Sequence, residues 1–454
     1  MDTQFVITRS STLAGGRFAP GHLGELTQHI PFEMVDAALA ATGTTQARLR
    51  DLPSRVVVYL LLAGCLFGEV GYSGVWRKLT AALVGIPTAA PTASALAQAR
   101  RRVGPTPLRW LFDLLRGPAA TARQQTGTWW RGLLVCAIDG TTLTVPDTAA
   151  VLRRLTKQRG NHGGTGYPQV RLVALLACGT RTVIDAVFGP TTTGETTYTT
   201  RLLSSLRPGM ILLADRNFAA KDLLSAVAAT GAQLLVRIKN GRRMPVLARY
   251  RDGSYLSMLG QLPVRMVDCQ ITISTTTGRH TGLYRLATTL LDPHRYPAAE
   301  VIRVYHQRWE IETAYLELKS SILGGRVLRA RTPTGIDQEI YALLIIYQLL
   351  RTAMADATAT NPSTDPDRAS FTIAWQTARD QVIQAANVIA DTVIDLVGTI
   401  GQHVLTNLLP DRRPRISPRI VKRAISKYQA RGPTIDRTSY KATLTIDILT
   451  GEPP

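Results

Sequence analysis

Two short apolar runs that each end in an aspartate constrain the fold of this chain more than any other feature. GLLVCAID ends at Asp139 and MILLAD ends at Asp215. Runs of this length between turn residues are typical of buried strands, and QVRLVALLAC, TVIDAVFG and AQLLVRIKN have the same character. Helical patterns, TTYTTRLLSSL and AKDLLSAVAATG, alternate with the later strands. The sequence therefore predicts an α/β fold, with helices packed on a mixed sheet.

Each aspartate, taken alone, has two interpretations. A carboxylate at the end of a buried strand is held rigidly at a sheet edge, where ligands can reach it. Alternatively, Asp139 and Gly140 form only a turn, and Asp215 only caps the helix that follows it. Both interpretations stay open for each residue.

A long helix predicted from about Ala298 to Leu323 carries a polar stripe. With 3.6 residues per turn, four polar positions fall within about 60° of azimuth, whereas Glu310 points away from them. Such a face is costly to bury unless it meets a metal, a phosphate or its own ion pairs. The alternative is a solvated face with an i, i+4 ion pair. The stripe consists of Tyr305, Arg308, Glu312 and Lys319, and Glu312 is the third candidate carboxylate.

The chain is strongly basic, with 53 Lys+Arg against 32 Asp+Glu and a formal net charge of +21. Most of the basic residues are Arg, whose guanidinium binds phosphate at two points, so a polyanion is the first partner to consider. A genome-wide bias toward Arg is the alternative. A short helix and a basic tail are candidate DNA contacts, against a packing helix and a solvated tail. The residues are Arg101 and Arg102 on the helix and Arg419, Lys422 and Arg423 in the tail.

Other features exclude several classes of protein. The apolar run Val56–Gly68 is shorter than the roughly 20 residues that cross a bilayer. The N-terminus lacks a secretory signal, so we expect a cytoplasmic protein with no membrane segment. Cys65, Cys136, Cys178 and Cys269 are too scattered for a zinc site and are interpreted as buried small hydrophobes. No P-loop motif occurs, so we expect no nucleotide cofactor.

The spacing Y-x2-R-x3-E-x6-K on the predicted helix resembles the signature of the insertion element 4 family of DDE transposases. IDGTT around Asp139 and LLADRNF around Asp215 are similar to the first and second acidic motifs of that family. LPSRVVVYLLLAGCLFGEVGYSGVWRKLT is similar to the N-terminal domain of many members. The resemblance covers about residues 15–430.

The resemblance implies an RNase H-like catalytic core interrupted by a β-rich insertion, with an all-α N-terminal domain and a helical, basic C-terminal region. In this division, residues 1–125 are a helical DNA-binding domain and 126–240 the first part of the core. Residues 241–297 are the β-strand insertion, 298–355 the second part of the core with the catalytic helix, and 356–454 the C-terminal helical region and basic tail.

The resemblance also implies roles for individual residues. Three carboxylates at one point repel each other, and their hard oxygens favour Mg²⁺ or Mn²⁺, here as two ions. Polar residues of the stripe would hold the phosphate near the terminal nucleotide. Family members often hold a flipped base with a Trp of the insertion, and a Tyr is the nearest substitute here. The carried-over residues are Asp139, Asp215 and Glu312 for metal and catalysis, Tyr305, Arg308 and Lys319 for phosphate, and Tyr284 for the base.

The implied activity is cut-and-paste transposition of an insertion sequence by two-metal-ion hydrolysis and strand transfer, through a DNA hairpin. The implied partners are the terminal inverted repeats of the element and target DNA, with a homodimer in the synaptic complex. The implied location is the bacterial cytoplasm, with nucleoid association when DNA is bound. Two alternatives stay open: a catalytically inactive, domesticated DNA-binding protein, and an RNase H-like nuclease acting on RNA hybrids or branched DNA.

Overall fold

The computed structural model describes residues 21–449 apart from 47, 49, 120–126, 158, 161–162, 165, 277, 362, 386–396, 411–414, 417–439 and 442. Arg419, Lys422 and Arg423 of the basic tail therefore lie outside the described residues. The chain forms two compact units, and the division falls within β2 and within α10. Unit 1 comprises Met1–Ala119, Leu143–Arg154 and Tyr315–Leu409, and unit 2 comprises Ala120–Thr142, Leu155–Ala314 and Pro410–Pro454.

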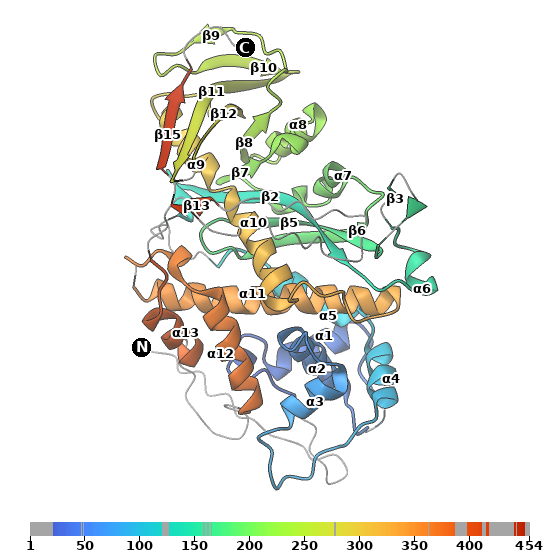
Figure 1. The fold of residues 1–454 in the computed structure, drawn as a ribbon. Helices are drawn as coiled ribbons and strands as arrows, with labels where there is room; N and C mark the ends of the chain where they lie inside the picture. The colour runs from blue at the N-terminus through green and yellow to red at the C-terminus, as the bar shows by residue number, and fades with distance from the viewer. Residues whose placement is uncertain are drawn as a thin grey trace. The chain divides into compact units, whose positions relative to one another are not determined.

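Unit 1 is a helical body around α11 (Pro333–Ala359), the long orange helix in Figure 1. Thr332 caps this helix, since its hydroxyl accepts a hydrogen bond from the Gly335 amide, and Pro333 occupies the first turn. The other helices of the unit are η1 (Leu26–Gln28), α1 (Phe32–Ala41), α2 (Ser54–Leu66), α3 (Tyr72–Leu79), α4 (Ala93–Val103), α5 (Thr106–Leu115), α6 (Ala149–Leu152), a π-helical segment (Glu317–Ile322), η5 (Pro366–Arg368), α12 (Phe371–Ile383) and α13 (Gly398–Thr406).

The residue ranges that make up unit 1 do not coincide with the five segments predicted from the sequence. Helix α11 packs against α2 and α5 from the N-terminal region and against α12 and α13 from the C-terminal region. A helix that is apolar on nearly all sides must be covered on all sides. The structure therefore places residues 315–409 in the same compact unit as residues 1–119.

Helix α11 is long and apolar enough, by length and composition, to cross a membrane. The sequence prediction rested on the run Val56–Gly68 and did not consider this helix. Inside the protein, 83% of the most apolar window of α11 is buried. This burial is typical of the central helix of a helical core.

Unit 2 is built on one large sheet with the strand order β6-β5-β2-β7-β8-β12-β11-β10-β9. Strands β2, β7 and β8 are parallel, whereas β5 and β6 form an antiparallel pair. The prediction of a mixed α/β sheet is confirmed.

The strands are β1 (Trp129–Trp130), β2 (Leu133–Thr144), β5 (Gln169–Ala177), β6 (Val183–Pro190), β7 (Met210–Ala214), β8 (Gln233–Ile238), β9 (Ala248–Arg249), β10 (Tyr255–Leu259), β11 (Leu262–Thr275), β12 (Gly278–Thr288) and β15 (Thr443–Ile448), the last paired with β11. Two short pairs stand apart, β3 (Arg159–Gly160) with β4 (Gly163–Gly164) and β13 (Arg415–Ile416) with β14 (Tyr440–Lys441).

Alternation along β2 assigns its side chains to the two faces of the sheet. Leu134, Cys136 and Ile138 belong to an apolar core that also contains side chains of α7 and α8. Because successive side chains point to opposite faces, Asp139 points to the other face. The helices and 3₁₀ turns of this part of the unit are α7 (Glu195–Thr200), η2 (Leu203–Ser205), η3 (Arg216–Phe218) and α8 (Lys221–Ala229).

Strands β9–β12 lie within residues 241–297, the segment predicted to be strand-rich. Strand β12 pairs with β8, so these strands extend the sheet that contains β2 and β7. A buried arginine holds the junction: Arg285 donates from Nε to an Asp268 oxygen at 3.2 Å and from another nitrogen to the Tyr255 hydroxyl at 3.0 Å. It also donates to the carbonyls of Asn240 and Arg242.

The prediction of one continuous helix over 298–323 is wrong. The structure has α9 (Ala298–His306), a turn, α10 (Trp309–Leu316) and then the π-helical segment. At the turn the Arg308 amide donates to the Tyr305 carbonyl, three residues back, which is tighter than an α-helix. No Pro or Gly marks this turn, so the pattern carried no signal for it.

The four cysteines are all buried and free of disulfides, as expected.

Candidate catalytic site

Asp139 lies in β2 with its side chain 22% exposed. One carboxylate oxygen accepts a hydrogen bond from the Gly140 amide at 2.8 Å. Gly140 also allows close packing, because a Cβ there would lie 2.6 Å from the carboxylate of Glu195 at the start of α7. The turn interpretation is therefore incomplete: the strand continues to Thr144, and the second Asp139 oxygen faces Arg308.

Asp215 follows β7, every residue of which is buried. Its carboxylate accepts a hydrogen bond from the Asn217 amide at 2.7 Å and so caps the 3₁₀ turn η3. The interpretation of Asp215 as a capping residue is therefore confirmed, with η3 as the element that it caps. Because β2 and β7 are adjacent parallel strands, Asp139 and Asp215 emerge toward the same edge of the sheet.

Arg308 connects two of the three candidate carboxylates. Its guanidinium donates to Glu312 at 2.9 Å, and another of its nitrogens lies 4.0 Å from Asp139. The i, i+4 pair considered in the sequence analysis therefore exists. It is not an ordinary solvated pair, because the Arg308 side chain is only 12% exposed and also faces a strand residue.

Glu310 lies two residues before Glu312 and has a different role. Its side chain is fully buried and accepts a hydrogen bond from Arg181 at 2.5 Å. Glu310 and Glu312 therefore have different arginine partners. Of these two neighbouring glutamates, Glu312 is the one beside Arg308 and Asp139.

Asp139 lies within electrostatic range of both other candidate carboxylates. Burial raises the pKa of Asp139 from 3.8 to about 7, against the Gly140 hydrogen bond and the Arg308 charge, which both lower it. The negative charges of Asp215 and Glu312 raise it further. Like charges within a few ångströms disfavour ionisation, so a bound cation would favour the ionised form of Asp139.

Tyr305 connects α9 to the end of β7. Its hydroxyl donates to the Ala214 carbonyl at 3.3 Å, one residue before Asp215. Burial raises the pKa of Tyr305 to about 12, Arg308 and Arg237 oppose that shift, and Asp215 adds to it. Tyr305 therefore lies among the charged groups of the site.

Removing the Tyr305 hydroxyl tests this connection. We expect Tyr305→Phe to lower the free energy of unfolding by about 1 kcal/mol, the usual net value of one buried hydrogen bond. Chemical denaturation of the full chain measures this change. A variant as stable as the parent chain would show that the hydroxyl does not anchor α9 to β7.

Two aromatic and basic residues extend the site toward the insertion. Tyr284 of β12 lies near enough to Tyr305 to raise its pKa. The Arg237 guanidinium, from β8, lies 4.0 Å from the centre of the Tyr284 ring and donates to the Leu283 carbonyl. Sequence reasoning missed Arg237, although an arginine among the apolar residues of AQLLVRI was a usable signal. It also missed Glu195, for which the sequence carried none.

The remaining predicted residues lie in unit 1 or outside the described residues. Lys319 lies in the π-helical segment, and Arg101 and Arg102 lie exposed near the end of α4. The structure therefore brings together Asp139, Asp215, Glu312, Tyr305 and Arg308, with Tyr284 beside them.

The donor set of the site fits a hard divalent cation by its chemistry, because it offers carboxylate oxygens whose charges repel one another. In the described parts of the chain, no three His, Cys, Asp or Glu side chains are grouped as a metal site requires. Asp215 is directed to the Asn217 amide and Glu312 to Arg308. The carboxylates thus lie within electrostatic range, each held by a protein partner.

Comparison with known proteins gave two family matches. Residues 20–113 match the family described as insertion element 4 transposase N-terminal, and residues 130–349 match the transposase DDE domain. The chain is 25% identical over 416 residues to transposase InsG for insertion sequence element IS4 of Escherichia coli (strain K12), covering 89% of this chain and 93% of that protein.

Two further similarities were found. The putative transposase InsZ of Escherichia coli (strain K12) is 28% identical over 206 residues, which is 45% of this chain and 67% of that protein. A piggyBac transposase synaptic complex with hairpin DNA has a TM-score of 0.45 and 11% identity, over 86% of this chain and 85% of that one. By its two family matches and its similarity to the IS4 transposase, this chain belongs to the insertion element 4 family of DDE transposases.

Proposed function

We propose that this transposase cuts and joins DNA with Asp139, Asp215 and Glu312 as its catalytic carboxylates. The observation that carries the proposal is the electrostatic coupling of the three: Asp215 and Glu312 both raise the pKa of Asp139, and Arg308 lies between Asp139 and Glu312. Groups whose pKa is strongly perturbed by burial and charged neighbours cluster at functional sites.

The strand order supports an RNase H-like core. In chain order β2, β5, β6, β7 and β8, Asp139 lies on the first strand, Asp215 follows the fourth, and Glu312 lies on a later helix. The acidic motifs of the family are expected in this arrangement. The strands that extend the sheet beyond β8 correspond to the insertion between the second and third acids.

We assign the residues of the site separate tasks. Asp139, Asp215 and Glu312 would hold two Mg²⁺ or Mn²⁺ ions. Such ions supply charge neutralisation at the scissile phosphate and a lowered pKa for an attacking water. Arg308 holds Glu312 and faces Asp139, and it offers the phosphate a guanidinium already positioned by α10. Tyr305 fixes α9 against the strand that precedes Asp215.

The proposed reaction begins with water attacking phosphorus at the element end, which breaks the bond to the 3′ oxygen and frees a 3′-hydroxyl. That hydroxyl then attacks a phosphorus of the opposite strand, which forms the hairpin and breaks the bond to the flanking DNA, released with a 3′-hydroxyl. Water then hydrolyses the hairpin and regenerates the 3′-hydroxyl of the element, which attacks a phosphorus of the target DNA and displaces a target 3′-hydroxyl. Tyr284 is our candidate for holding the displaced base, with Arg237 against one face of its ring. Two chains would act together on two element ends, and Lys319, Arg101, Arg102 and the basic tail would add DNA contacts.

A cleavage assay tests the function. The full chain is incubated with Mg²⁺ and a DNA duplex. The duplex spans the junction between the end of the element that carries the gene and the DNA outside the element. We expect nicking at the junction and a hairpin product on a denaturing gel. Cleavage of an RNA–DNA hybrid but not of this duplex would indicate a nuclease instead. Binding without cleavage in either Mg²⁺ or Mn²⁺ would indicate a DNA-binding protein that has lost catalysis.

A further inference from the structure

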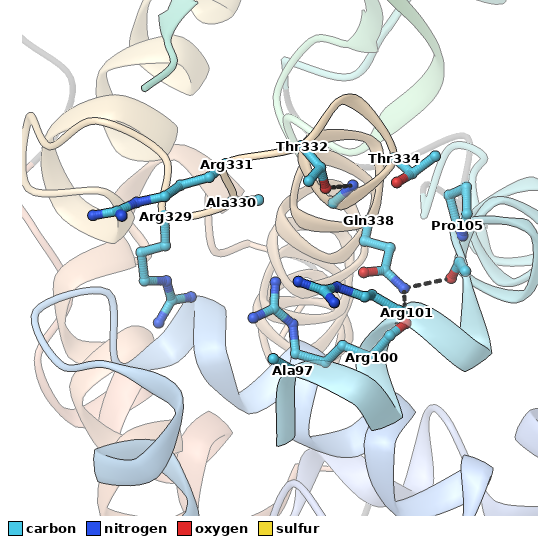
Figure 2. A pocket seen from close by; sticks show the side chains of 12 residues that line it. Ala97, Arg100, Arg101, Pro105, Arg329, Ala330, Arg331, Thr332, Thr334 and Gln338 are labelled. Atoms are coloured by element: carbon cyan, nitrogen blue, oxygen red, sulfur yellow. Dashed lines mark hydrogen bonds between the residues drawn. The ribbon is translucent and has the colours of Figure 1, made fainter. Parts of the chain in front are cut away.

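A pocket of about 350 Å³ in unit 1 lies between the end of α4 and the start of α11 (Figure 2). Arg100 and Arg101 line it from α4, and Arg329 and Arg331 line it from the loop before α11. None of the twelve lining residues is acidic. A cavity with this lining is suited to an anion.

The arginines of the pocket differ in what neutralises them. Arg329 donates to Glu339 at 3.2 Å and to two backbone carbonyls, those of Gly64 and Val70. Glu339 in turn accepts the backbone amides of Arg329 and Ala330. Arg329 is therefore a structural residue whose charge is balanced inside the protein.

Arg100 and Arg101 have no such balance. Among the described residues, neither forms an ion pair with a carboxylate, and the nearby Asp337 is paired with Arg154 at 2.6 Å. The guanidinium of Arg100 stacks 3.7 Å from the centre of the Tyr72 ring, and its Nε is buried without a hydrogen-bond partner. In Figure 2 both side chains extend from α4 toward the loop that leads to α11. A buried donor without an acceptor is a site where a ligand oxygen would gain a hydrogen bond.

The floor of the pocket fixes these arginines in place. The buried Gln338 of α11 donates from its amide nitrogen to the Arg100 carbonyl at 2.8 Å and to the Gly104 carbonyl at 2.7 Å. These bonds hold the end of α4 against the first turns of α11, whose partial positive charge also favours an anion. Thr332 and Thr334, exposed at the rim, add hydroxyl groups.

We propose that this pocket binds a backbone phosphate of DNA, with Arg100 and Arg101 as its ligands. The inference rests on the proposed function for its source of phosphate and adds a second, non-catalytic contact in unit 1. The inference also changes the role expected for Arg101. The sequence suggested a residue on an exposed helix face that reads a DNA groove, whereas the structure places Arg101 in the lining of a pocket beside α11. A phosphate contact of this kind positions DNA without reading its sequence.

The test compares the double variant Arg100→Met, Arg101→Ala with Arg77→Ala, which removes an exposed arginine of α3 outside the pocket. Met keeps an unbranched apolar stem against Tyr72. Binding of the junction duplex is measured by fluorescence anisotropy across a salt series. We expect the double variant to bind about tenfold more weakly and its logarithmic salt slope to fall by about one, the value for one lost phosphate contact. Arg77→Ala should match the parent chain.

Ethylation interference identifies the contact directly. In the parent chain, ethylation of particular phosphates should block binding, and the double variant should lose the interference at one position while keeping the others. An unchanged interference pattern and salt slope in the double variant, with normal cleavage by the parent chain, would overturn the pocket but leave the proposed function intact. Absence of DNA binding by the parent chain would overturn both.

A single variant guards against misfolding. Arg101 is exposed, so Arg101→Ala alone should keep the parent melting temperature and show a smaller loss of DNA binding than the double variant.

Inorganic phosphate, compared with chloride at equal ionic strength, tests the other source of the ligand. If phosphate stabilises the parent but not the double variant, while both bind DNA equally, the pocket holds a free anion and the proposal is wrong.

Discussion

Glu312→Gln is expected to lower Mg²⁺-dependent cleavage of the junction duplex by about a hundredfold to a thousandfold, the usual scale for loss of one preorganised electrostatic group at a charged transition state. The neutral amide keeps the size of the side chain and its contact with Arg308 but supplies no negative charge for a divalent ion. Because the side chain is 38% exposed, we expect no loss of folding and unchanged binding of the duplex.

Glu300→Gln is the matched control for this variant. Glu300 lies in α9 and its ion pair with Arg131 is at the surface, so the same change there should leave cleavage within about twofold. Cleavage and binding are measured on the same DNA. A reaction with EDTA, which removes the divalent ion, gives the background level of cleavage. Cleavage by Glu312→Gln at the parent rate would remove Glu312 from the catalytic set.

The second large effect is on stability and concerns Glu310. Glu310→Gln should lower the free energy of unfolding by about 3 kcal/mol, because it deletes a negative charge beside the buried Arg181 guanidinium. Thermal and chemical denaturation measure the loss. Glu312→Gln is the comparison here, and it should lose less stability, because the Glu312 side chain is 38% exposed whereas that of Glu310 is fully buried.

We therefore expect substitutions of Glu310 and Glu312, two residues apart, to have opposite effects on stability and on cleavage. Glu310→Gln should reduce stability while the folded fraction still cleaves DNA, whereas Glu312→Gln should remain stable and fail to cleave. If both variants lose stability equally, the separation of roles along α10 is wrong. Cleavage is best compared at low temperature, where both variants are folded.

The local elements of unit 2 were predictable because their apolar patterns are strong. GLLVCAID, QVRLVALLAC and MILLAD became β2, β5 and β7, and the register of each agrees with the side chains that enter the core. The turn at Gln307 and Arg308 was not predictable, since none of the surrounding residues breaks a helix. It follows from tertiary contacts that Tyr305 and Arg308 make with β7 and β2.

The candidate site was predictable in part for a similar reason. The three acids were found from strand ends, helix spacing and family resemblance, and the i, i+4 pair of Arg308 and Glu312 from spacing alone. That Arg308 also faces Asp139 depends on how α10 lies over β2, which no local pattern encodes. Likewise, the pocket between α4 and α11 joins segments more than 200 residues apart in sequence, as in the bond from Gln338 to Arg100.

The pairing of β12 with β8 has a consequence for engineering. Because β8 is hydrogen-bonded on one side to β7 and on the other to β12, removal of residues 241–297 would leave β8 as an open edge. Such an edge invites aggregation with other chains. Swapping this segment for that of a relative therefore requires a donor hairpin that matches the ladder from Leu235 to Ile238, and a flexible linker in its place would give an insoluble product.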